Sequence, residues 1–169
     1  MAAQWELLLV DADVLIDYVV ADVSILGRVA RRVGSVYVVQ SVLAEVEGLD
    51  ASDCASLGVE IVEPSIDQLL EAAAEPRRRL SFNDRLSLIV AADAGWTCVS
   101  NDRALRKACD IRKVPVWWGL QLMLALVRAG ELDSDTALAV ARTIHESNPL
   151  HITLEIVKRF EQQLARHRG

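Results

Sequence analysis

Two aspartates lie just after strand-like stretches of the sequence. Asp11 comes at the end of the apolar stretch Trp5–Val10. Asp102 follows the stretch Trp96–Val99 through the short link Ser100–Asn101. In open parallel sheets the functional crevice lies beyond the carboxyl ends of the strands, at the point where the strand order reverses. If these two strands are neighbours there, both carboxylates face one crevice.

Two further acids can reach the same crevice from helices. Glu45 is expected one turn into a helix over Gln40–Leu49, within an apolar turn. Asp84 is expected in the first turn of a helix that begins at the capping-box pattern Ser81–Asp84 and runs to about Ala94. A first-turn aspartate commonly serves only to cap its helix or to offset the helix dipole. An acid among apolar residues, such as Glu45, is harder to explain in that way, because burying an unpaired carboxylate is costly.

Carboxylates that gather in one crevice repel one another, and some of them are forced to take up a proton. A hard divalent cation removes that conflict, since Mg²⁺ and Mn²⁺ prefer oxygen ligands and also coordinate phosphate oxygens. Zinc chemistry is not indicated, because the three histidines all lie near the C-terminus and the three cysteines lack metal-ligand spacing. The acids therefore predict metal-assisted hydrolysis of a phosphodiester bond.

The elements that must position these acids alternate between short β-branched strands and longer helices. This alternation predicts an α/β fold of three layers, α/β/α, with a central parallel sheet of about five strands. The chain of 169 residues is expected to form one domain, 1–169, in which residues 117–169 are a helical C-terminal extension. The remaining strands are expected at Val36–Val39, Val59–Val62 and Val114–Val116, and the remaining helices at Ala12–Val20, Val23–Val33, Ser65–Ala74, Asn101–Ala108, Trp117–Ala129, Ser134–Ser147 and Thr153–Ala165.

Composition favours a soluble, cytoplasmic protein. The sequence has no signal-peptide pattern, and its longest apolar stretch, Val114–Val127, is shorter than the roughly 20 residues that cross a bilayer. An odd number of cysteines without motif spacing favours reduced, packed thiols. The net charge of −6 disfavours nonspecific binding to nucleic acid, yet arginine outnumbers lysine 15 to 3. Guanidinium groups suit bidentate phosphate contacts, and the candidates for such contacts include Arg79, Arg85 and Arg103.

Four segments of the chain resemble the motifs of the PIN-domain family, above all the VapC-type toxins of toxin–antitoxin pairs. They occur in the family's order and the resemblance extends from about Leu7 to Val116. Each segment alone is short and weakly specific. The resemblance becomes specific because all four segments occur together, each in the expected strand or helix. The segments are LLLVDADVLID, VVQSVLAEVEGL, LSFNDRLSLIVAADAG and CVSNDRALRKA.

The resemblance implies a ribonuclease that requires Mg²⁺ or Mn²⁺, forms a homodimer and binds an antitoxin protein near its active site. Ser100 matches a small hydroxyl that the family often places two residues before its last acid, where it can hold a carboxylate or a phosphate. Asp13 departs from the usual Asn or Ser and could add a further acid, and Asn101 joins it and Ser100 as a supporting residue. The resemblance assigns catalysis and metal binding to Asp11, Glu45, Asp84 and Asp102, and RNA binding is expected at Arg79, Arg85 and Arg103.

Other functions remain open on the sequence. LLLVDADVLID also resembles the opening motif of haloacid-dehalogenase-type phosphatases, in which two aspartates two residues apart act as nucleophile and acid/base. That motif normally continues Gly-Thr, whereas Val14 and Leu15 follow here, and no lysine has the required setting. A non-catalytic PIN-like binding module is a further alternative, although such a module would normally have lost one of the four acids. A receiver-type signalling domain fits poorly, because Trp117 stands where a lysine would be needed.

Overall fold

The computed structural model describes residues 4–74 and 79–167. Its centre is a sheet of five parallel strands in the order β3-β2-β1-β4-β5. The predicted three-layer α/β/α class is confirmed. The strands are β1 (Glu6–Val10), β2 (Gly34–Val39), β3 (Val59–Val62), β4 (Thr97–Val99) and β5 (Val116–Trp117).

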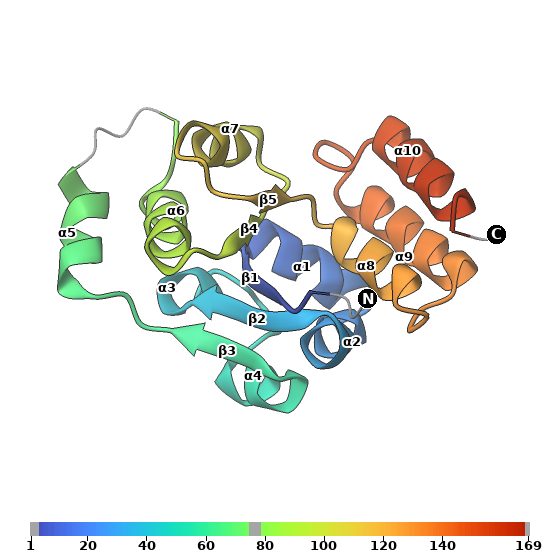
Figure 1. The fold of residues 1–169 in the computed structure, drawn as a ribbon, viewed down its shortest axis with the longest axis horizontal. Helices are drawn as coiled ribbons and strands as arrows, with labels where there is room; N and C mark the ends of the chain where they lie inside the picture. The colour runs from blue at the N-terminus through green and yellow to red at the C-terminus, as the bar shows by residue number, and fades with distance from the viewer. Residues whose placement is uncertain (1–3, 75–78, 168–169) are drawn as a thin grey trace.

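Helices cover both faces of this sheet (Figure 1). On one face α2 packs on β2 and α4 packs on β3, while on the other α6 packs on β4 and α7 on β5. The helices that connect and flank the strands are α1 (Ala12–Ala21), α2 (Ser24–Arg32), α3 (Gln40–Leu43), α4 (Ala51–Leu57), α5 (Ile66–Ala74), α6 (Phe82–Ala94) and α7 (Arg103–Ile111).

The chain ends in a group of helices beside the sheet, α8 (Gln121–Arg128), α9 (Ser134–Ser147) and α10 (Leu154–Ala165). Figure 1 shows α10 on the outside of this group, where it packs against both α9 and α8. Helix α9 packs against α1, and α8 packs against α2. The side chains of Val157, Phe160 and Leu164 are buried, so one side of the final helix packs on its own chain.

The sheet is built from nearly continuous apolar strands, because both of its faces are covered. Leu8, Leu9 and Val10 of β1 are each at most 1% exposed. The three cysteines are free and buried, as expected for packed thiols. No helix within the described ranges is long and apolar enough to span a membrane.

The segment after β2 differs from the prediction. The helix expected over Gln40–Leu49 is only the single turn α3, and turns follow it up to Gly48, whose φ of 81° is left-handed. A second helix, α4, was not predicted. It begins at Asp50 with a capping box to Asp53, and both partners of that box can be found in the sequence.

The region around β5 also begins later than predicted. The strand is Val116–Trp117 rather than Val114–Val116, and α8 begins at Gln121 rather than at Trp117. The amide oxygen of Gln121 accepts a hydrogen bond from the Trp118 backbone N–H at 2.5 Å. This contact holds Trp118 outside the helix, in the link between sheet and extension.

Candidate active site

The two strand-end aspartates lie on neighbouring strands. Val10 of β1 is in register with Val99 of β4, and the N–H of Asp11 donates to the carbonyl oxygen of Val99 at 3.0 Å. β1 has β2 on its other side, so the strand order reverses between β1 and β4. The prediction that these strands are neighbours at the switch point is therefore confirmed, and Asp11 follows one of them directly.

A single buried hydroxyl connects the ends of the two strands. Ser100 is fully buried, and its Oγ donates to Oδ2 of Asp11 at 3.0 Å. The same oxygen accepts a hydrogen bond from the backbone N–H of Asp102 at 3.0 Å. Ser100 thus holds the Asp11 carboxylate and the start of α7 in one fixed arrangement. Asp102 itself caps α7, because its Oδ1 accepts from the N–H of Leu105 at 2.8 Å.

Asp11 is an unusually poor acid in this setting. Burial, and after it the negative charge of Asp84, raise its pKa to about 7 against the opposing effect of the Ser100 hydrogen bond. Asp13 contributes a smaller repulsion. The charge of Asp84 therefore couples the start of α6 electrostatically to the end of β1.

Asp13, on the first turn of α1, belongs to the same group of charges. Burial raises its pKa, and so do the carboxylates of Asp102 and Asp84, whereas His151 lowers it. The four aspartates Asp11, Asp13, Asp84 and Asp102 therefore interact electrostatically, although they come from the end of β1, α1, α6 and the link after β4. Asp13 thus remains a candidate for a further acid of the site.

Asp84 also has the capping role that the sequence allowed. Ser81 Oγ accepts from the Asp84 N–H at 3.0 Å, and the Asp84 carboxylate accepts from the Ser81 N–H at 2.9 Å. This capping box fixes the carboxylate at the start of α6. The capping and the electrostatic contact with Asp11 are compatible, since a carboxylate offers several lone pairs.

Glu45 lies in the turns that follow α3 and is exposed. Its Oε1 accepts a hydrogen bond from the side-chain amide of Asn83. The carbonyl oxygen of that amide accepts from Ser41 Oγ at 2.7 Å. Asn83, which sequence reasoning missed, thereby connects Glu45 to the first turn of α6, one residue from Asp84.

The acids do not form a closed metal cage. Within residues 4–74 and 79–167, no three Asp, Glu, His or Cys side chains are grouped closely enough to hold one metal ion. The hydrogen bonds of the acids instead go to neighbouring polar side chains. Ser100 contacts Asp11 at one end of the site, and Asn83 contacts Glu45 at the other.

A second buried acid, Asp17, was also missed. Its two carboxylate oxygens accept from Asn101 Nδ2 at 3.2 Å and from Asn148 Nδ2 at 3.0 Å. Burial raises its pKa to about 6 in spite of these hydrogen bonds. Asn148 follows α9, so this contact attaches the C-terminal helices to α1 beside the candidate site.

Asn101 is the centre of this attachment. Its Oδ1 accepts from the N–H of Gly119 at 2.9 Å, and the carbonyl of Gly119 accepts from Tyr18 Oη at 2.7 Å. A Cβ atom at position 119 would meet the Asn101 side chain at 3.1 Å, which explains the glycine. Asn101 therefore supports the site by fixing the link between β4 and the extension.

A hollow of about 230 Å³ opens between α1 and the end of α9, beside Asp13. Acidic groups line one side of it, and the C-terminal extension contributes His151 on the other. The lining residues are Asp13, Ile16, Asp17, Val20, Ser147, Asn148 and His151.

The structure corrects one of the three arginine predictions. Arg85 is only 3% exposed, and its guanidinium donates to the carbonyl oxygens of Ala72 at 2.8 Å and Leu80 at 2.7 Å. It stabilises the end of α5 against α6 and is not free to contact RNA. Arg79 and Arg103 are exposed.

Comparison with family models, with curated proteins and with solved structures gives no match to this chain.

Proposed function

We propose that the protein is a metal-dependent endoribonuclease of the PIN-domain type, which hydrolyses phosphodiester bonds in RNA. The observation that carries the proposal is the Ser100 hydroxyl at the strand switch point, which contacts both the Asp11 carboxylate and the backbone N–H of Asp102, together with the charge of Asp84 that raises the pKa of Asp11. Such repulsion between acids destabilises the fold, and strongly raised pKa values of this kind cluster at functional sites.

The donor set suits a hard divalent cation. All of the candidate ligands are carboxylate oxygens, and a cation would offset both the burial and the repulsion by Asp84 that raise the pKa of Asp11. Asp11, Asp84 and Asp102 would hold Mg²⁺ or Mn²⁺, with Glu45 at the edge of the site. Because no three of the described acids form a ready group, binding would have to draw these side chains together. When bound, the cation would lower the pKa of a water molecule and offset the charge of the phosphate.

The protein's own residues would position and balance these charges. Ser100 fixes the orientation of the Asp11 carboxylate through its hydrogen bond. Asn83 would hold Glu45 at the site through its amide. Asp13 adds negative charge on α1, which favours cation binding over binding of a free anion.

The proposal extends to the toxin role, the compartment, the oligomeric state and the protein partner. A VapC-type toxin would act in the cytoplasm as a homodimer and would be inhibited by an antitoxin protein bound near the acids. The four motifs support this narrower proposal. A gene for a small DNA-binding protein immediately upstream would favour it strongly.

Asp84→Asn is expected to abolish metal-dependent RNA cleavage while leaving the fold intact. Asparagine keeps an oxygen that can accept in the capping box but lacks the charge that a cation needs. The measurement is cleavage of a single-stranded RNA in Mg²⁺ or Mn²⁺, with circular dichroism as the check on folding. Asp67→Asn is the matched control, since Asp67 is an exposed acid in the first turn of α5. Full activity of the folded Asp84→Asn protein would refute the mechanism.

Arg103 and Arg85 are expected to respond differently to substitution. Arg103→Glu should weaken RNA binding and reduce the slope of log affinity against log salt by about 1, because one phosphate contact is lost. Arg85→Ala should instead lower the free energy of unfolding, because two carbonyl groups lose their donor. Filter binding over a salt series and urea unfolding separate the two effects. An unchanged salt slope for Arg103→Glu would mean that Arg103 makes no phosphate contact.

A further inference from the structure

A pocket lies between the link that follows β5 and the last helix, α10. Its volume is about 230 Å³, just below the range of about 300–1,000 Å³ that is usual for drug-sized ligands. The size suits one small planar group. The lining residues are Trp118, Leu120, Gln121, Ile156, Arg159, Phe160 and Gln163.

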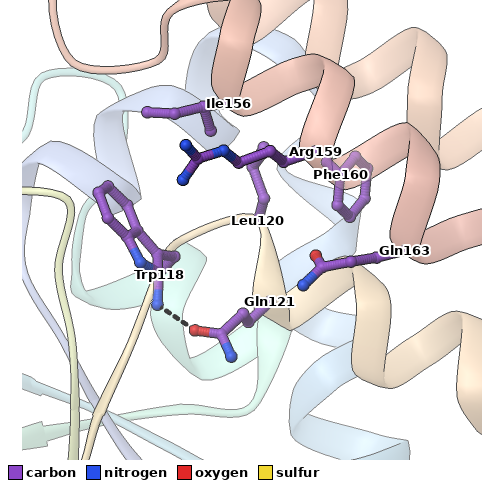
Figure 2. Close-up of a pocket in the computed structure, with 7 residues that line it drawn as sticks. All are labelled: Trp118, Leu120, Gln121, Ile156, Arg159, Phe160 and Gln163. Atoms are coloured by element: carbon purple, nitrogen blue, oxygen red, sulfur yellow. Dashed lines mark hydrogen bonds between the residues drawn. The ribbon is translucent and has the colours of Figure 1, made fainter.

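Trp118 forms one wall of this pocket and is held there rigidly. The guanidinium carbon of Arg106 lies 3.8 Å from the centre of its ring, and the Gln121 side chain accepts from its backbone N–H. Figure 2 shows the indole at one side of the pocket and the side chain of Arg159 extending from α10 towards it. Trp118 is half-buried, so part of the ring remains available to a ligand.

The other walls combine apolar surface with hydrogen-bonding groups. Ile156, Leu120 and Phe160 supply the apolar part, while Gln163 and Arg159 supply donors. Arg159 is paired with Glu155 at 2.6 Å, but both side chains are 73% exposed, so this ion pair costs little to rearrange. An aromatic ring, a guanidinium and amide side chains are the groups on which proteins stack and recognise unpaired bases.

The pocket is connected to the candidate active site by direct contacts. Arg106, whose guanidinium lies over Trp118, donates from Nη1 to the carbonyl oxygen of Ser100 at 3.1 Å. The Ser100 hydroxyl in turn holds Asp11. The N–H of Ser100 donates to the carbonyl of Trp117, the neighbour of Trp118, at 3.0 Å. A nucleotide bound in the pocket is therefore close in the structure to the residues that hold the acids.

We propose that this pocket binds one unpaired base of the RNA substrate, stacked on Trp118 and covered by Arg159. This inference rests on the proposed function for the identity of the ligand. The cationic side chains of Arg106 and Arg159 complement the anionic nucleotide. The C-terminal extension then contributes a wall of the substrate site through α10.

The test measures binding of a short fluorescein-labelled single-stranded RNA in EDTA, so that no cleavage interferes. Trp118→Ala should weaken binding about 5- to 150-fold, the range that corresponds to loss of one stacked base. Trp118→Phe should retain most of the affinity, since it keeps an aromatic face. Trp5→Ala is the control, because Trp5 is 52% exposed and lies at the start of the chain, where it bonds Ser35.

A set of RNAs, each with the base removed at a different position, identifies the nucleotide that stacks on Trp118. At that position, removal of the base should weaken RNA binding to the wild-type protein but not to the Trp118→Ala protein. If Trp118→Ala binds RNA and cleaves it as well as the wild type does, the pocket proposal is wrong and the ribonuclease proposal stands.

Adenosine monophosphate serves as a second probe, which does not depend on the ribonuclease proposal. If the wild type cleaves no RNA but binds this nucleotide through Trp118, the pocket proposal stands and the ribonuclease proposal falls. Absence of binding to both probes would overturn the pocket proposal, and cleavage of RNA in Mn²⁺ tests the ribonuclease proposal separately.

Discussion

Asp11→Asn is expected to make the protein more stable at about pH 8 while it removes RNA cleavage. Burial and the neighbouring charge of Asp84 raise the pKa of Asp11 from 3.8 to about 7. At about 1.36 kcal/mol for each pKa unit, this corresponds to roughly 4 kcal/mol of destabilisation in the ionised state. Asparagine disturbs the hydrogen bond from Ser100, which costs about 1 kcal/mol, so we expect a net gain of about 1–3 kcal/mol.

The pH dependence of this gain has a defined sign. Because the pKa of Asp11 is higher in the folded than in the unfolded protein, the folded state binds the proton more tightly. Ionisation of Asp11 therefore lowers stability progressively as the pH rises from about 4 to about 7. The difference between Asp11→Asn and wild type should be smallest near pH 4 and should reach its full size above pH 7.

Urea unfolding of both proteins across this pH range, without divalent cations, measures the difference. Asp133→Asn is a control of opposite sign, because hydrogen bonds from Thr136 lower the pKa of Asp133 at the start of α9. That variant should be less stable than wild type at neutral pH. If Asp11→Asn is destabilised to the same extent at every pH, Asp11 is an ordinary structural cap.

Mn²⁺ is expected to stabilise the wild type against unfolding, and the effect should depend on the strand-end acids. A cation that binds only the folded state at 100 times its dissociation constant adds about 2.7 kcal/mol. For a chain of this size, that is a rise in Tm of roughly 5–10 °C. The rise should be larger at about pH 8 than at about pH 6, because the cation must displace the proton from Asp11.

Thermal unfolding in Mn²⁺ and in EDTA measures this stabilisation without reference to activity. Asp11→Asn and Asp102→Asn should lose most of the rise in Tm, whereas Asp67→Asn should keep it. An equal rise in Tm for wild type and Asp11→Asn would place the cation somewhere other than the strand ends.

The part of the site that the sequence predicted follows from local rules. Asp11 and Asp102 could be located because a residue that directly follows a parallel strand must lie at the carboxyl edge of the sheet. The capping box of Asp84 is also a local pattern, and it occurs as expected. The β-branched strands and the periodic helices were enough to predict the α/β/α class.

The part that was missed depends on contacts between residues far apart in the chain. Asp17 is held by Asn101 and Asn148, which are 84 and 131 residues away in sequence. Hydrophobic periodicity carries no information on such pairs, and a buried Asp on α1 looks like any helix acid in the sequence. The same holds for Asn83, which contacts Glu45 from 38 residues away.

Arg85 shows how a charged residue can mislead. It stands among arginines in the sequence, and that setting favoured a phosphate contact. It also begins the run of residues, Arg85–Ala91, that α6 buries. The carbonyl oxygens of Ala72 and Leu80 satisfy its guanidinium inside the protein, which makes its burial possible.

The rate of cleavage of a single-stranded RNA by the wild-type protein tests the central claim most directly. It should be measured in Mn²⁺, in excess EDTA, and again after Mn²⁺ is restored. The acids at the ends of β1 and β4 predict cleavage in Mn²⁺, loss of cleavage in EDTA and full recovery when the cation returns. Undiminished cleavage in EDTA, or no cleavage under any of the three conditions, would contradict the account.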